Sequence, residues 1–117
     1  MKNDINIVFL GDIVGKPGRR IVKDLLTDGY EKITRIKKEE AFLIANVENA
    51  SHGFGLTKKN YEECVEMGFN CRTSGNHIWD KKDIFDYIDE AQILLRPLNY
   101  SEGTRGIGYN VFDFTNS

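Results

Sequence analysis

The chain is organised around a stretch past its middle, Cys71-Arg72-Thr73-Ser74-Gly75-Asn76-His77. Residues 69–73 have the character of a short strand, and Gly75 marks the point where that strand gives way to a loop. The polar pair Asn76-His77 follows directly, before a new helical pattern begins. A strand that delivers an amide and an imidazole to a loop predicts a functional site just past its carboxyl end.

Two earlier strands end in the same way. The apolar run 5–10 is followed by Gly11-Asp12, and the apolar run 41–47 is followed by Glu48-Asn49. In an open α/β sheet, the carboxyl ends of parallel strands form one crevice, where ligands bind. The sequence therefore predicts that these polar residues converge on the pair Asn76-His77 at one edge of a sheet.

The alternation of strand and helix patterns favours an α/β fold with βαβ units, a mainly parallel sheet and flanking helices. Near-continuous apolar runs predict that strands 5–10 and 41–47 are covered on both faces. Further strands are expected at 69–73, 93–95 and 109–114, and helices from residue 19, over 31–38, from residue 57 to Gly68 and after residue 80. The side chains expected to face inward from these helices include Ile21, Ile33, Tyr61, Cys64, Val65, Ile84, Phe85 and Ile88.

Two helix starts carry capping signals. Thr57 is a suitable N-cap for the helix that follows it. Asp80 and Asp83 have the spacing of a capping box, with Asp83 where Glu or Gln is usual, so Asp80 is interpreted as an N-cap rather than a ligand.

The composition is that of an ordinary globular protein of one domain: 117 residues, 40% hydrophobic and 29% charged. A net charge of −2 implies no broad basic surface, so bulk nucleic acid is not an expected partner. The apolar runs are too short to cross a membrane, and no signal segment precedes the first strand. We therefore expect a cytoplasmic protein in which Cys64 and Cys71 are buried free thiols.

The convergent side chains have a coherent chemistry. The carboxylates of Asp12 and Glu48, the amide of Asn76 and the imidazole of His77 suit divalent manganese, iron or zinc better than a thiolate-loving ion. A carboxylate can bridge two such ions about 3.5–4 Å apart, as in many phosphatases and nucleases. A histidine beside them can donate a proton to a leaving oxygen, because imidazole titrates near neutral pH.

Each of these residues also has a purely structural interpretation. Asp12 can cap the next helix, Glu48 can be an exposed side chain, and Asn49 and Asn76 can form turns. His77 can be a packed surface histidine. The structural interpretation is preferred for four further residues, namely Lys16, Arg19, Arg20 and His52. The only argument for a common function of the main group, Asp12, Glu48, Asn49, Asn76 and His77, is that all of them are expected at the same edge of the sheet.

Five motifs together resemble the YmdB-like branch of the calcineurin-like metallophosphoesterases. They are Gly11-Asp12-Ile13-Val14-Gly15-Lys16-Pro17-Gly18-Arg19, Ile44-Ala45-Asn46-Val47-Glu48-Asn49-Ala50, Gly53-Phe54-Gly55-Leu56-Thr57, Gly75-Asn76-His77-Ile78-Trp79-Asp80-Lys81-Lys82 and Arg96-Pro97-Leu98-Asn99-Tyr100. The resemblance implies an α/β/β/α sandwich whose two divalent ions, iron or manganese with zinc as the alternative, hydrolyse phosphodiesters such as 2′,3′-cyclic nucleotides.

Carried over residue by residue, the resemblance assigns each member of the group a role. Asp12 would bind the first metal ion, with Asn49 assisting, and Glu48 would bridge the two ions. Asn76 would bind the second ion, and His77 would protonate the leaving oxygen or stabilise the charged phosphoryl group. Many members of the broader family have Asp-x-His at the first position, but Ile13-Val14 follows Asp12 here, as in this branch.

Length is the main departure from the family. Its members are roughly twice as long, and their second half supplies further His ligands, including a Gly-His-x-His element, whereas this chain has only His52 and His77. Residues 1–117 are thus expected to form one partial domain, with the C-terminal half absent, an incomplete metal site and little activity alone. The missing second sheet should leave an exposed apolar face that favours homo-oligomers. The rival interpretations are a non-catalytic nucleotide-binding or regulatory module and a half-domain that needs a complementary chain.

Overall fold

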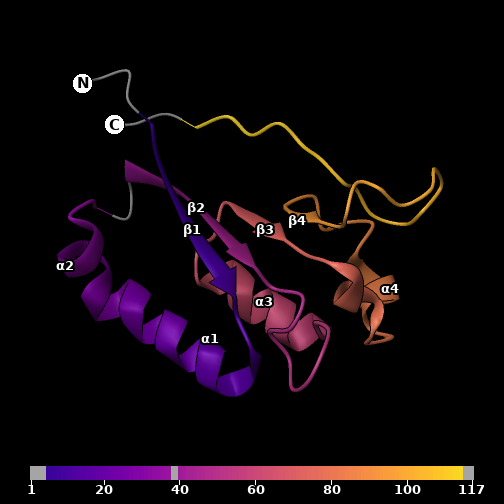
Figure 1. The fold of residues 1–117 in the computed structure, drawn as a ribbon, viewed down its shortest axis with the longest axis horizontal. Coiled ribbons are helices and arrows are strands. Elements are labelled where there is room, and N and C mark those ends of the chain that lie inside the picture. Colours follow the sequence, from indigo (N-terminus) through magenta and orange to yellow (C-terminus); the bar gives the residue numbers. More distant parts are fainter. Residues whose placement is uncertain (1–4, 38–39, 115–117) are drawn as a thin grey trace.

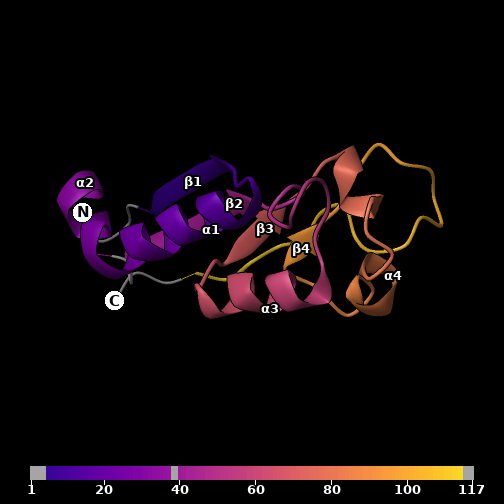
Figure 2. The same cartoon turned by 90° about the horizontal axis from the view of Figure 1, so that it is seen from below.

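The computed structural model describes residues 5–37 and 40–114, in which four parallel strands form one sheet. The strands are β1 (Asn6–Asp12), β2 (Ala41–Asn46), β3 (Cys71–Thr73) and β4 (Leu94–Leu95), and they lie side by side in chain order (Figure 2). The register pairs Asn6 with Ala41 and Asp12 with Asn46, with an irregularity between Leu10 and Asp12. The predicted mainly parallel sheet is confirmed.

Helices fill each crossover between neighbouring strands. After β1 come α1 (Gly15–Asp24), a π-helical continuation η1 (Leu25–Gly29) and α2 (Tyr30–Thr34), which ends at Arg35 in the left-handed region. After β2 comes α3 (Lys58–Glu66), and after β3 come the 3₁₀ helix η3 (Asn76–Trp79) and α4 (Ile84–Tyr87). Right-handed crossovers between strands in chain order place the helices on one face of the sheet, and Figure 1 shows α1 and α3 along the same side.

The core lies between this face and the helices. Odd-numbered residues of β2 point into it, and Leu43 and Ala45 are almost completely buried. The described residues include no helix with the length and apolarity that crossing a membrane requires. Other members of the core are Val22, Tyr30, Leu56, Cys64, Met67, Ile78, Ile84, Ile88 and Leu94.

Both cysteines are free and buried, as predicted. Burial raises the pKa of the Cys64 thiol to about 11, against a smaller lowering effect of the nearby Arg72. The pKa of Cys71 is raised by the same cause. Because the thiolate is the reactive form, these two cysteines are structural apolar side chains.

The other face of the sheet corrects one prediction and confirms another. Ile5, which precedes β1, and Ile7 and Phe9 within β1 are 57–65% exposed, so this strand is not covered on both faces as its apolar run predicted. Sequential crossovers leave the second face without helices, and the expected exposed apolar face is therefore present.

The C-terminal segment is not the predicted strand 109–114. The described part of this segment packs on β2: the ring centroids of Phe112 and Phe114 each lie 5.6 Å from that of Phe42 in β2. Figure 1 shows this segment, in yellow, on the side of the sheet opposite to α1 and α3. The alternating apolar residues thus cover part of β2 by side-chain packing, without joining the sheet.

Several local predictions for the helices are wrong. The helix predicted over 31–38 is already finished at Thr34, and Lys38 lies outside the described residues. Asp80 is not an N-cap, because α4 begins at Ile84 with Asp83 in the cap position and no side-chain cap. Thr57 is confirmed as the cap of α3, accepting a hydrogen bond from the Asn60 amide. Four side chains expected to face inward are exposed instead, namely Ile21, Ile33, Val65 and Phe85.

Candidate active site at the carboxyl edge of the sheet

The predicted site residues lie where the chain leaves β1, β2 and β3. Asp12 is the last residue of β1, and Glu48 and Asn49 follow the end of β2. Asn76 and His77 open η3, shortly after β3. Because the strands are parallel, all three exits lie at one edge of the sheet, as the sequence predicted.

Asp12 and Asn49 join the exits of β1 and β2. The Asn49 Nδ2 atom donates to both carboxylate oxygens of Asp12, at 3.2 and 3.0 Å. The backbone reinforces the connection, because the amide of Gly15 donates to the Asn49 carbonyl at 2.9 Å. The side-chain oxygen of Asn49 is buried and has no hydrogen-bond partner among the described residues. An acceptor oxygen therefore stands beside a carboxylate with its lone pairs unused.

Glu48 joins the exits of β2 and β3. Its Oε2 atom accepts a hydrogen bond from the backbone amide of His77 at 3.1 Å, and Asn46 Nδ2 lies 3.4 Å from Oε1. Gly75 lies directly against this carboxylate, because a Cβ atom at position 75 would be 2.4–2.8 Å from the Glu48 carboxylate atoms. Gly75 has a φ of −120°, which other residues also adopt, so this position needs glycine because there is no space for a side chain. The close approach fixes where the Glu48 carboxylate lies.

The imidazole of His77 is held at its edge and at one face. Its Nδ1 atom lies 3.0 Å from Asp80 Oδ2, and the ring of Phe54 stacks on it with centroids 4.1 Å apart and planes inclined by 10°. With Nδ1 engaged, Nε2 is the nitrogen left for a ligand. The sequence pattern favoured a capping role for Asp80 and indicated no role for Phe54. The i, i+3 spacing of His77 and Asp80 was the available signal for the first contact, whereas Phe54 carried none.

Other candidates lie apart from these contacts. Asn76 is exposed, and no hydrogen bond joins its side chain to the rest of the site within the described ranges. His52 and Lys16 are also exposed, in keeping with the structural interpretation. Arg19 has the preferred structural role: its side chain is 14% exposed, lies 3.4 Å from Glu63 and donates to the Ala50 carbonyl. It anchors the loop after β2 instead of facing the site.

Comparison with known proteins identifies the family. The family model described as YmdB-like protein matches residues 8–117. The chain belongs to the YmdB-like family. A curated relative, the 2′,3′-cyclic-nucleotide 2′-phosphodiesterase of Bacillus subtilis, is 47% identical over 104 residues, which are 89% of this chain and 38% of the relative.

Solved structures agree with this YmdB-like assignment. The crystal structure of a novel phosphatase from Mycoplasma pneumoniae superimposes with a TM-score of 0.82 at 37% identity, covering 98% of this chain and 41% of the other. A hypothetical protein from Thermus thermophilus superimposes with a TM-score of 0.77 at 36% identity, covering 92% and 39%. The YmdB-like chain thus spans about two fifths of the length of the relatives it matches.

The donor atoms of this YmdB-like site fit part of a divalent-cation centre. Carboxylates and amide oxygens are hard donors of the kind that such ions select, and the partnerless Asn49 oxygen beside Asp12 is available to a cation. Within residues 5–37 and 40–114, no group of three or more His, Cys, Asp or Glu side chains is placed to hold a metal ion. The fit therefore concerns a partial set of ligands.

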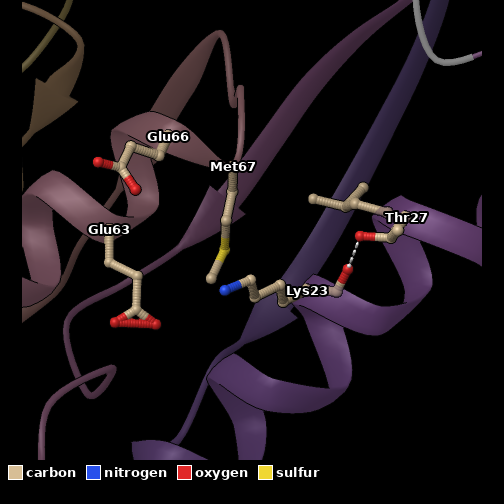
Figure 3. A pocket seen from close by; sticks show the side chains of 6 residues that line it. Lys23, Thr27, Glu63, Glu66 and Met67 are labelled. Atoms are coloured by element: carbon tan, nitrogen blue, oxygen red, sulfur yellow. Dashed lines mark hydrogen bonds between the residues drawn. The ribbon is translucent and has the colours of Figure 1, made fainter.

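Two cavities among the described residues differ in how they lie relative to the candidate site. A cavity of about 240 Å³ lies between α1 and α3, where Lys23 and Met67 point toward each other beside Glu63 (Figure 3). It is lined by charges of both signs and includes none of the predicted site residues. A second cavity of about 380 Å³ reaches Asp12 and is otherwise mainly apolar, with Leu10, Ile21 and Leu25 in its wall. This second cavity adjoins the candidate site.

Proposed function

We propose that this site contributes to a metal-dependent phosphodiesterase that acts on small phosphodiesters, with 2′,3′-cyclic nucleotides as a substrate class. The observation that carries the proposal is the set of contacts that links Asp12, Asn49, Glu48 and His77 across three strand exits. The name of the Bacillus subtilis relative supports the substrate class.

Four side chains would hold the metal ions in this proposal. Asp12 and Asn49 would bind one divalent ion, Asn76 a second, and Glu48 would bridge them. Iron or manganese suits this oxygen-rich set, and zinc is the alternative. Bound cations would supply neutralisation of the phosphoryl charge and a more acidic water molecule.

His77 would act on the leaving oxygen. With its Nδ1–H directed at the Asp80 carboxylate, a protonated ring presents Nε2–H outward. As water adds to phosphorus, it would release one proton to solvent, and as the bond to the leaving oxygen breaks, the Nε2 proton would pass to that oxygen, leaving a phosphate monoester and a neutral imidazole that is reprotonated from solvent. Asp80 would stabilise the imidazolium before the transfer and hold the ring orientation throughout.

The test compares His77→Ala and Asp12→Asn with His52→Ala in a version of the chain extended to the length of its relatives, using a 2′,3′-cyclic nucleotide, whose leaving ribose oxygen needs a proton, and Mn²⁺. Loss of a positioned proton donor should lower kcat by about 10²–10⁴-fold. His52→Ala is the matched control, because His52 is exposed and lies outside the site contacts. Equal activity of the His77→Ala and His52→Ala variants would contradict the proposal.

The same variants separate the rival functions. A nucleotide-binding or regulatory module would show no metal-dependent turnover, and the substitutions would lower only its affinity for nucleotides. We expect residues 1–117 by themselves to show little turnover, since His52 and His77 are their only histidines. Turnover by this chain equal to that of the version extended to the length of its relatives would refute the expectation.

A further inference from the structure

Phe54 is a large apolar side chain that remains 55% exposed at the rim of the candidate site. Its ring lies almost parallel to the imidazole of His77, 4.1 Å away between centroids. One face of the histidine is therefore covered by a residue that comes from a different loop, 23 positions earlier in the sequence. The contact is between two side chains only, so it is independent of the hydrogen bonds that hold the backbone of η3.

The loop that carries Phe54 is fastened on the side facing the site. The amide of Gly55 donates to the carbonyl of Glu48, and the amide of Ser51 donates to the carbonyl of Gly55 at 3.1 Å. Gly55 has a φ of +94°, and a Cβ atom there would lie 2.7 Å from Lys81 Cγ and 3.4 Å from the His77 carbonyl oxygen. The loop thus packs against the turn that contains His77.

A second attachment ties the loop to α3. Ser51 is 1% exposed, and its hydroxyl donates to Asn60 Oδ1 at 2.7 Å while accepting from the Thr57 amide at 2.8 Å. A buried hydroxyl with both partners satisfied resists displacement, because breaking either bond would leave a polar group unpaired. The hydrogen bonds of Ser51 and Gly55, which flank Phe54 in the sequence, therefore hold Phe54 in position.

We infer that Phe54 is a positioning residue for His77, an inference that rests on the proposed function. The hydrogen bond from Nδ1 to Asp80 fixes one point of the imidazole but lets the ring turn about that point. The stacked ring of Phe54 fixes the plane. Both contacts are needed to define the direction of Nε2, since the His77 side chain is 34% exposed and has room to move.

The test uses the chain extended to the length of its relatives, with Phe54→Leu, Phe54→Tyr and the matched control Phe85→Leu. Phe85 is also a half-exposed phenylalanine, and it stacks on Trp79 of the same 3₁₀ helix with centroids 5.7 Å apart. Its substitution therefore reports any general loosening of η3. NMR measures the chemical shifts of the His77 ring protons, which a stacked aromatic ring moves upfield, and steady-state kinetics measures kcat and KM.

Phe54→Leu should remove the upfield shift and lower kcat about tenfold, the factor expected from losing one stacked aromatic pair. KM should remain within about twofold, because Phe54 acts through His77 rather than on the substrate. Phe54→Tyr should keep both the upfield shift and kcat close to the parental values. Phe85→Leu should do the same.

Two results would overturn the inference. One is a Phe54→Leu enzyme with parental kcat. The other is a fall in kcat while the His77 shifts stay unchanged, since Phe54 would then act by another route. Failure of the proposed function gives a different pattern, in which His77→Ala retains activity whatever the NMR shifts show.

Discussion

Arg72 places a guanidinium group inside the molecule, between β3 and α3. It is completely buried, and its Nη2 atom donates to the carbonyl of Cys64 at 2.9 Å. The guanidinium carbon lies 5.7 Å from the centre of the Tyr61 ring. Among the described residues, Nε and Nη1 have no hydrogen-bond partner, and burial lowers the pKa of the side chain. One hydrogen bond and one aromatic face are little compensation for a desolvated charge.

Replacing this charge should therefore not weaken the fold. We expect Arg72→Met to keep or raise the free energy of unfolding, by up to about 1–3 kcal/mol, because an apolar chain of similar length has no desolvation cost. Arg96→Met is the control, since Arg96 donates to the carbonyls of Pro97, Thr104 and Arg105 and should lose stability. Urea unfolding followed by the fluorescence of Trp79, the single tryptophan, measures both. A marked loss of stability in Arg72→Met would show that the buried charge is better satisfied than these contacts indicate.

A second prediction concerns the space beside Glu48. Gly75→Ala would put a methyl group within 2.4 Å of the carboxylate, so we expect a loss of about 1–3 kcal/mol from overpacking. The displaced carboxylate should also lower the proposed phosphodiesterase activity in the extended chain. Gly11→Ala has no heavy atom within 4 Å of the new methyl group and should change stability by less than about 0.5 kcal/mol. Equal effects of the two substitutions in thermal unfolding would argue against the steric role of Gly75.

At the scale of elements, the cap of α3 can be tested directly. Thr57 accepts a hydrogen bond from the Asn60 amide at 3.2 Å, which satisfies a free donor at the start of the helix. Thr57→Ala should lower the free energy of unfolding by about 1 kcal/mol. Thr27→Ala is matched, because the Thr27 hydroxyl only donates to the carbonyl of Lys23 within the helix and is exposed. If the two variants unfold at the same urea concentration, the cap contributes nothing.

The strands also show which features of the fold could be predicted from the sequence. The apolar runs before Asp12 and Glu48 and the strand before Asn76 were enough to predict parallel strands and a shared edge, because hydrophobic pattern and crossover geometry act locally. The same runs could not reveal that one face of β1 is open. Ile7 and Phe9 satisfy the pattern of a strand covered on both sides, but nothing in the described structure covers them.

The contacts around His77 mark the other limit of prediction. Asp80 has the sequence signature of a helix cap, but its carboxylate is taken by the imidazole three residues earlier. The capping prediction failed because the neighbouring His77 side chain contacts the carboxylate that would have capped the helix. Phe54 reaches His77 only because Gly55 and Ser51 bend and fasten the loop between them. A contact that depends on tertiary placement of a short loop has no periodic signature in the sequence.

For the whole molecule, the sheet and the family comparison give one picture. The helices lie on one face, the C-terminal segment covers part of β2 on the other, and β1 is an edge strand whose outer face stays apolar and open. The chain spans about two fifths of the length of its relatives. We therefore expect this edge strand, with its exposed apolar face, to be where chains associate.

Self-association of residues 1–117 should therefore depend on the open face of β1. We expect Ile7→Lys to shift the chain toward monomer while changing the free energy of unfolding by less than about 0.5 kcal/mol, since Ile7 is 65% exposed. Val8→Lys is the matched control from the opposite face, where Val8 packs against the core, and a buried unpaired charge there should unfold the chain. Sedimentation velocity over a concentration series reports the first effect and circular dichroism the second. A parent chain that stays monomeric at every concentration, or an Ile7→Lys chain that associates as strongly as the parent, would mean that this face does not drive association.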